Sequence, residues 1–310
     1  MIWGSSFLFI KLSVAELHPL YATLGRVLAG ATTLLVVLAV LRVRLPRDPA
    51  LWGHLAVAAT VGVVIPFTLF GYGEQRIPSL LAGIWNATTP LVVLPMAVLV
   101  FRTEKLTTRR ATGMAMGFAG VLVVLGAWRG IGGAEFTGQL MCFAAAACYG
   151  VAIPYQKRFI AGRAESGVAL AAGQLVMGLA QLVVVVPLVA GAPPALGDLS
   201  LAAIGSVVLL GVFGTGVAFA INLRNIRIAG ASAASTVTYL VPIVAVLIGV
   251  LVLDESLAWY QPVGALIVLA GVAVSQGLLG GRSRRALPGR GPDDPARPVV
   301  SAPVGTGPLQ

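Results

Sequence analysis

The amino-acid sequence predicts an all-α polytopic membrane protein with ten transmembrane helices, arranged as two inverted repeats of five helices each. Three observations predict this fold class. The composition is strongly apolar, ten apolar runs have the length of a membrane crossing, and a set of motifs recurs about 150 residues further along the chain.

The composition is that of a protein embedded in lipid. Of the 310 residues, 58% are hydrophobic and 10% are charged, and the mean hydropathy is +0.94. Soluble domains are roughly 45–50% apolar and about 25% charged. The net charge of +10 does not indicate a nucleic-acid partner, because the cations lie in short segments between apolar runs, where membrane topology places them.

Apolar runs separated by loop-like breaks predict the ten spans, most of them long enough to cross about 30 Å of hydrocarbon. None of the runs alternates apolar and polar residues as a β-barrel strand does. The predicted spans are residues 1–15, 20–41, 51–72, 79–101, 111–128, 137–156, 167–190, 200–221, 231–253 and 258–279.

The positive charges predict the orientation of the chain. Seventeen Lys and Arg residues fall in one set of alternate loops together with the tail, and only Arg76 and Arg129 fall in the opposite set. Because cytoplasmic loops carry the excess of cations, both termini are expected in the cytoplasm. The sequence carries no sign of an organelle signal, so the expected location is a bacterial inner (cytoplasmic) membrane as a multi-pass protein.

An internal repeat divides the chain into two halves. The residues Glu104, Leu106, Gly113 and Gly120 recur 151 positions later as Glu255, Leu257, Gly264 and Gly271, and Pro90 recurs 152 positions later as Pro242. The first repeat is expected at 1–128 and the second at 137–279. Because five spans is an odd number, the second half enters the membrane the other way up, which is typical of secondary transporters.

The two ends of the chain complete this division. Trp3-Gly4 precedes Lys11 by the same spacing as Tyr149-Gly150 precedes Lys157, and on this comparison the first helix is truncated by roughly ten residues. Residues 280–310 are rich in Pro, Gly and Arg and are expected to form a disordered cytoplasmic tail.

At these residues the sequence resembles the EamA family of the drug/metabolite transporter superfamily. The resemblance rests on Trp3-Gly4-Ser5-Ser6 with Lys11, on Arg26, and on the doubled motif of small residues, proline, glutamate and paired glycines, over about residues 1–279. It implies a ten-helix transporter of small metabolites, often an exporter of amino acids or related compounds. One departure concerns the residue before each glutamate, which is often glycine in the family and is Thr103 or Asp254 here.

The paired prolines predict where a solute binds. Proline in mid-helix leaves the carbonyl four residues earlier without its donor, and paired interruptions near the midplane point to a transporter site. The carbonyls freed by Pro90 and Pro242 are those of Asn86 and Thr238. Trp85 and Tyr239 stand beside them and could enclose a small organic solute. The alternative is that both prolines only kink helices for packing.

Polar residues inside the spans are further candidates for the site. Arg26 lies about 9 Å from the outer end of its span, so it either binds a substrate carboxylate or extends to the lipid headgroups. Lys11, Tyr149 and Asn222 are candidate substrate ligands, and Gln139, Gln174 and Gln181 either touch substrate or join helices. Glu74, at an outer mouth, could carry a proton, but its exposed position next to Arg76 favours a solvated ion pair between the two side chains. The glycines Gly113, Gly117, Gly120, Gly264 and Gly271 are expected to mark close helix contacts.

These features predict a secondary transporter that moves a small metabolite, such as an amino acid-like solute, by alternating access, and that acts as an exporter. The rival functions are a passive facilitator or lipid flippase on the same scaffold and, further off, a non-transporting scaffold. No phosphate-binding loop, metal cluster or nucleophile elbow is present in the sequence, so an enzyme and a cofactor are not expected. The expected partners are a small molecule and the lipid bilayer, with proton coupling and oligomeric state left open.

Overall fold

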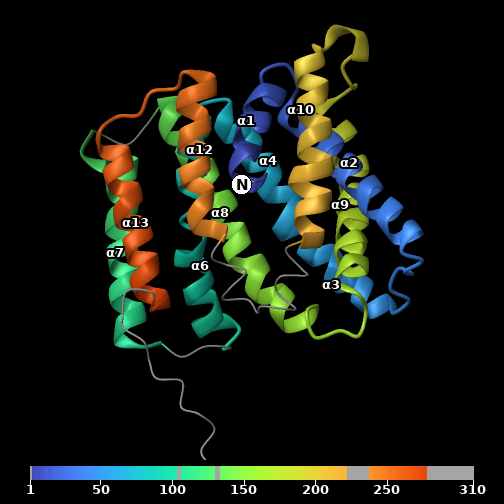
Figure 1. Cartoon of the computed structure of the whole chain (residues 1–310), viewed down its shortest axis with the longest axis horizontal. Coiled ribbons are helices and arrows are strands. Elements are labelled where there is room, and N and C mark those ends of the chain that lie inside the picture. The colour runs from blue at the N-terminus through green and yellow to red at the C-terminus, as the bar shows by residue number, and fades with distance from the viewer. Residues whose placement is uncertain (1, 103–105, 130–132, 222–236, 278–310) are drawn as a thin grey trace, which may run out of the picture.

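The computed structural model describes residues 2–102, 106–129, 133–221 and 237–277, and every regular element in these ranges is helical (Figure 1). The α-helices are α1 (Ile2–Val14), α2 (Pro19–Val40), α3 (Pro49–Ala59), α4 (Ile65–Glu74), α5 (Ser79–Asn86), α6 (Thr89–Pro95), α7 (Thr108–Leu125), α8 (Gly133–Phe159), α9 (Gly167–Ala190), α10 (Leu201–Gly211), α12 (Val237–Leu253) and α13 (Tyr260–Gln276). Three π-helical segments, η1 (Thr60–Val64), η2 (Met96–Val100) and η5 (Val212–Val217), continue α3, α6 and α10, and short 3₁₀ turns lie at Ala127–Arg129 and Leu196–Asp198.

Six helical stretches of the described chain are long and apolar enough to cross a membrane, judged by length and composition. They are Pro19–Val40, Pro49–Glu74, Ser79–Val100, Gly133–Phe159, Gly167–Ala190 and Leu201–Ile221. Three shorter apolar helices accompany them in the described chain, at Ile2–Val14, Leu240–Leu253 and Tyr260–Gln276. The prediction of an all-helical multi-pass protein is therefore confirmed at this level.

Side chains at the first residues explain where several helices begin. Ser166 and Ser200 each accept a hydrogen bond from the backbone N–H three residues on, and Asp48 accepts one from Ala50, as N-caps do. The carboxylate of Glu16, in the α1–α2 turn, in turn accepts hydrogen bonds from the Ser200 hydroxyl at 2.6 Å and the Ser200 N–H at 2.8 Å. These hydrogen bonds lower the pKa of Glu16. The start of α10 is thus attached to the end of α1.

The π-helical segments η1 and η5 begin 152 residues apart, and both are tied to a neighbouring helix by polar side chains. Gln174 and Gln181 of α9 donate to the carbonyls of Ala58 and Ala56, each at 3.1 Å, beside η1. A wider helical turn displaces backbone hydrogen bonds, so such carbonyls need outside donors. The helix-joining role considered for these glutamines is the one that the structure shows.

Helices α7 and α13 lie side by side at one edge of the molecule (Figure 1) and touch backbone to backbone. A Cβ added at Gly271 would lie 2.5 Å from the Gly117 nitrogen and 2.6 Å from the Gly113 carbonyl oxygen. A Cβ added at Gly120 would meet Val268 and Gly264 in the same way. The prediction that these glycines mark close helix contacts is therefore confirmed.

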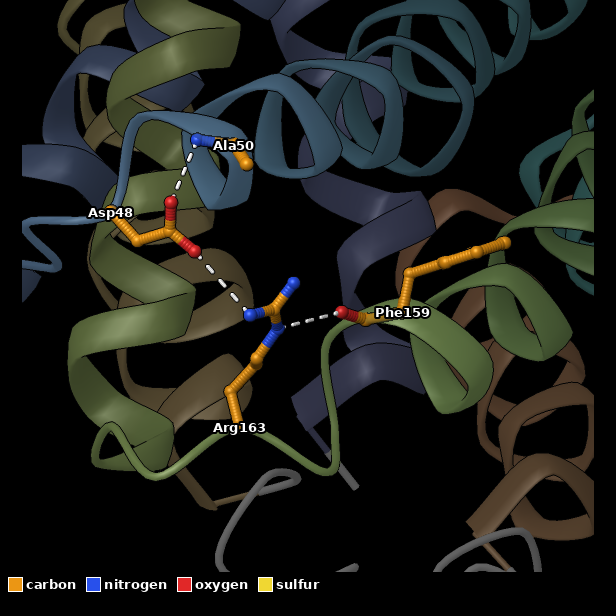
Figure 2. Close-up of polar contacts among 4 residues, drawn as sticks. All are labelled: Asp48, Ala50, Phe159 and Arg163. Carbon is orange, nitrogen blue, oxygen red and sulfur yellow. Dashed lines mark hydrogen bonds and ion pairs between the residues drawn. The ribbon is translucent and has the colours of Figure 1, made fainter.

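At the end that the charge pattern assigns to the cytoplasm, an ion pair joins the start of α3 to the loop after α8 (Figure 2). The Arg163 Nη1 lies 3.3 Å from Asp48 Oδ2, and the Arg163 Nε donates to the Phe159 carbonyl at 3.4 Å. The other carboxylate oxygen of Asp48 accepts from Ala50 N–H at 2.9 Å. Both side chains are 40% exposed, so the pair contributes at most about 1 kcal/mol of stability.

The α7–α13 contact makes a direct prediction for stability. Gly271→Ala places a methyl group against backbone atoms that cannot rotate away, so we expect a loss of about 1–3 kcal/mol in the free energy of unfolding. The matched control is Gly205→Ala in α10, where a Cβ has nothing within 4 Å. That substitution should leave stability within about 1 kcal/mol of the wild type. Thermal unfolding of the detergent-solubilised proteins measures both, and equal midpoints would contradict the contact.

Candidate functional site

Arg26 is a buried cation at a contact between segments far apart in the sequence. It lies on α2, is 6% exposed, and its Nε donates to the Thr215 hydroxyl of η5 at 2.9 Å. The guanidinium carbon lies 3.5 Å from the centre of the Phe67 ring of α4, a cation–π geometry. The side chain is therefore buried among helices and does not extend toward the lipid headgroups; the binding of a substrate carboxylate by Arg26 stays a prediction.

Thr215 can meet Arg26 because glycines let α2 approach η5 closely. A Cβ at Gly211 would lie 2.6 Å from the Arg26 carbonyl oxygen, and one at Gly30 would lie 2.9 Å from the Thr215 methyl. The Trp3 indole N–H donates to the Gly214 carbonyl at 3.1 Å, and the Thr215 hydroxyl donates to the Leu210 carbonyl at 3.2 Å. The π-helical turn therefore has its displaced carbonyls satisfied while Thr215 still accepts from Arg26.

A small cavity of about 10 Å³ adjoins Arg26. It is lined by side chains of α1, α2, α4 and α10, among them Ser13, Thr23 and Phe67. Such a volume holds one water molecule. A solute can reach the guanidinium only when these helices separate, so this conformation is closed around the cation.

Tyr149 of α8, another candidate site residue, interacts electrostatically with Arg26. Its ring lies 6.1 Å from that of Phe70, centre to centre, in a stacked arrangement. Trp85 belongs to the same apolar cluster, and its indole N–H donates to Gln139 Oε1 at 3.3 Å. The structure thus places Tyr149 and Trp85 in one aromatic cluster, and Arg26 against Phe67 of α4, the helix that carries Phe70 of that cluster.

The predicted helix interruption before Pro90 is present. Helix α5 ends at Asn86, Ala87 and Thr88 form a turn, and α6 begins at Thr89. Threonine hydroxyls satisfy the freed carbonyls, since Thr89 Oγ1 donates to the Asn86 carbonyl at 2.8 Å and Thr88 Oγ1 donates to that of Trp85 at 2.7 Å. Sequence reasoning did not anticipate these two donors.

The corresponding region of the second half is described only in part. Helix α12 runs through Pro242, so no interruption is seen between residues 237 and 253. Asn222 lies outside the described residues, as do the side chains of Thr238 and Tyr239. Their role as substrate ligands stays a prediction.

Lys11 lies in the last turn of α1, with its ammonium group on the backbone of the α4–α5 turn. Its Nζ donates to the Glu74 carbonyl at 2.6 Å and to the Ile77 carbonyl at 3.0 Å. These carbonyls lie at the C-terminal end of α4 and in the turn after it, where a positive charge is favourable. The observed contacts of Lys11 are therefore with a helix end.

Glu255 supports the other side of the same turn. Its carboxylate accepts from Ser79 N–H at 2.8 Å, from the Ser79 hydroxyl at 2.9 Å and from Leu80 N–H at 3.0 Å, which caps α5. The preceding residue, Asp254, has a φ of +52°. Aspartate tolerates this left-handed conformation, so it fills a position where the resemblance leads us to expect glycine.

The expected ion pair between Glu74 and Arg76 is wrong. Glu74 is 0% exposed, and neither of its carboxylate oxygens has a hydrogen-bond partner among the described residues. Arg76 is exposed and donates to the Tyr72 carbonyl at 2.7 Å. Positions two apart on a helix do not face each other, so the closeness of the two residues in sequence did not make them a pair.

Comparison with known proteins identifies relatives over most of the chain. The model of the EamA-like transporter family matches residues 1–126 and 136–276. An uncharacterized inner membrane transporter of Escherichia coli K12, YedA, is 30% identical over 291 residues, covering 89% of this chain and 88% of that protein. An uncharacterized transporter of Bacillus subtilis, YoaV, is 24% identical over 274 residues, covering 88% and 92%.

Two further relatives bear on function and on fold. A protein of Streptantibioticus cattleyicolor named a probable terminal-alkyne amino-acid exporter is 26% identical over 290 residues, covering 93% of this chain and 94% of its own. A crystal structure of a protein 20% identical in sequence superimposes with a TM-score of 0.62, covering 89% of this chain and 96% of the other. That likeness shows a common fold.

The cap on α5 gives a testable prediction. Glu255→Ala leaves two buried N–H groups and a hydroxyl without their acceptor, so we expect the free energy of unfolding to fall by about 1–3 kcal/mol. Asp254→Gly, in the same turn, is the control and should change stability by less than about 1 kcal/mol, since glycine adopts a positive φ freely. Thermal unfolding in detergent compares them. If both variants unfold at the same temperature as the wild type, the cap does not stabilise this turn.

Proposed function

This chain belongs to the EamA-like transporter family, and from that premise we propose that it is a secondary transporter that exports a small, carboxylate-bearing metabolite across the cytoplasmic membrane by alternating access. The family and the names of the relatives indicate a membrane transporter rather than an enzyme. The buried Arg26 carries the more specific part of the proposal.

The architecture that we propose is ten spans in two inverted repeats, at 1–128 and 137–279, with both termini in the cytoplasm. Several observations support it. The family model matches the chain twice, π-helical segments begin 152 residues apart, and cations concentrate in alternate loops. Two inverted halves that rock against each other would expose a site between them to each side in turn.

Arg26 supports a carboxylate substrate for two reasons. Among the described residues no carboxylate lies within ion-pair distance of its guanidinium, so a buried cation is held by a hydroxyl and an aromatic ring alone. Burial without an ionic partner is costly, and intramembrane cations usually serve transport. A guanidinium binds a carboxylate through two parallel hydrogen bonds, which suits this role.

The surroundings of Arg26 support a small organic solute with an apolar part. Phe67 provides aromatic surface against the cation, and Phe70, Tyr149 and Trp85 form an aromatic cluster that includes the next turn of the same helix. One relative is named as an exporter of an amino acid, and amino acids combine a carboxylate with side chains of this kind. Lys11, Asn86, Asn222, Thr238 and Tyr239 remain proposed ligands of that solute.

The test compares metabolites released by cells that express wild-type protein, Arg26→Ala or the control Arg76→Ala, at matched protein levels. We expect a carboxylate-bearing solute that accumulates outside with the wild type to fall at least about tenfold with Arg26→Ala, since a buried charge pair is lost. Arg76→Ala removes an exposed arginine and should leave release unchanged.

The outcomes separate the possible functions. Release undiminished by Arg26→Ala contradicts the binding site and leaves a transporter. Release that persists after collapse of the proton gradient, and that never exceeds the internal concentration, indicates a passive facilitator. Absence of any released solute contradicts export.

A further inference from the structure

The carboxyl group of Glu74 is enclosed by protein and has no hydrogen-bond donor. It is the last residue of α4, is 0% exposed, and both Oε atoms lack a partner among the described residues. An ionised carboxylate in such surroundings costs several kcal/mol, because it has lost its water and gained nothing in exchange. A neutral carboxyl group avoids most of that cost.

The cations close to Glu74 already donate elsewhere. Lys11 of α1 and Arg26 of α2 reach its carboxyl group electrostatically. Their observed hydrogen bonds, however, go to the carbonyls of Glu74 and Ile77 and to the Thr215 hydroxyl. Their positive charge favours an ionised Glu74, but they supply no donor to it in this conformation.

The remaining titratable groups around Glu74 also give its carboxyl group no hydrogen-bond donor. Glu255, after α12, brings a negative charge that opposes ionisation, and its oxygens are occupied by the cap on α5. On α8, Cys142 lies within electrostatic reach of Glu74. On the α4 side, Tyr72 points to His18, with its hydroxyl 3.3 Å from Nε2, and Arg76 donates to a backbone carbonyl.

Beside Glu74, α4 and α8 approach each other closely. A Cβ at Gly73 would strike the Cys142 sulfur and lie 3.1 Å from the Gly138 carbonyl oxygen. A Cβ at Gly138 would in turn lie 3.1 Å from the Gly73 carbonyl oxygen and 2.9 Å from Ile77. Because Glu74 is 0% exposed, water can reach its carboxyl group only if α4 separates from a helix packed against it, such as α8 or α1.

We propose that Glu74 is a proton-binding site whose occupancy controls the opening of the outer end. With the proton bound, α4 packs against α8 as observed. When the proton leaves a carboxylate oxygen for water on the outer side, the ionised group needs hydration, and the α4–α8 contact opens. No other bond changes. The proposal rests on the proposed function, because in an exporter proton binding would close the outer end after the solute has left.

Cys142 provides a built-in reporter of that opening. It is 0% exposed, it lies at the α4–α8 contact, and it is a free thiol. In a Cys148→Ser background it is the single thiol in the chain. The experiment measures its rate of modification by a membrane-impermeant methanethiosulfonate added outside, from roughly pH 5 to pH 9. Full-length protein in cells is compared with the same protein carrying Glu74→Gln.

The ratio of the two rates isolates the effect of Glu74. An ionised Glu74 close to Cys142 disfavours the reactive thiolate, so its charge alone would lower the wild-type rate, and a rise in the ratio therefore reports opening. We expect the wild-type rate to rise at least about tenfold relative to Glu74→Gln as the pH increases. Glu16→Gln is the matched control. Hydrogen bonds from Ser200 keep the pKa of Glu16 low, so it stays ionised over the range, and its removal should leave the wild-type pH dependence intact.

A ratio that stays flat with pH overturns the proposal, and so does a Cys142 that remains unreactive at every pH. Glu74→Leu serves as a second uncharged reference should Glu74→Gln fail to accumulate. The assay needs no solute, so the two proposals can fail separately. A flat ratio with normal solute release removes only the proton site, whereas a rising ratio without any solute release removes only export.

Discussion

The turn at residues 75–78 joins α4 to α5, and both helices have their terminal residues at this turn buried in the protein. The structure around the turn depends on which groups form hydrogen bonds with those helix termini. The last carbonyls of α4 and the first N–H groups of α5 have no intrahelical partners, and water cannot replace them at buried positions. Lys11 supplies donors on one side and Glu255 supplies acceptors on the other. A cation at a helix C-terminus and an anion at an N-terminus are also the favourable charges for the helix dipoles. One consequence is that α1 and the segment after α12 are fixed against the same turn. Glu74 then has no donor to itself, because its nearest cation is engaged by backbone.

Much of the helical framework could be predicted from the sequence because the bilayer makes hydropathy decisive. Span positions follow from apolar length, and the break after Asn86 follows from Pro90, whose ring cannot be accommodated without freeing a carbonyl. The close α7–α13 contact followed from glycines at helical spacing. The π-helical segments could not be predicted, since nothing in the local sequence distinguishes a wider turn until neighbouring donors such as Gln181 and Trp3 are placed beside it.

The site was predictable by residue type and not by pairing. Arg26 and Tyr149 were candidates because polar groups inside spans are expensive, yet Thr215, which accepts from Arg26, is 189 residues away along the chain. Lys11 and Glu255 likewise meet the α4–α5 turn across separations of 63 and 176 residues. Glu74 was misjudged for the same reason, because its neighbour in sequence suggested a solvated pair while its neighbours in space exclude water.

The contacts of the two π-helical segments are alike in position and unlike in chemistry. Arg26 and Gln174 each lie eight residues after the N-cap of their helix, and each donates at or just before a π-helical segment of the other half of the chain. If the proposed inverted repeats hold, these are equivalent positions, and rocking would exchange their surroundings. Gln174 is neutral and its amide donates to a backbone carbonyl that joins two helices, whereas Arg26 is charged and lacks a carboxylate partner among the described residues. Among the described residues, Arg26 is therefore the counterion that we propose for a solute carboxylate, on the α2–η5 side. The proton site proposed at Glu74 lies on that same side, within electrostatic reach of Arg26. Movement of α4 relative to α8 would thus change the surroundings of both charged groups at once.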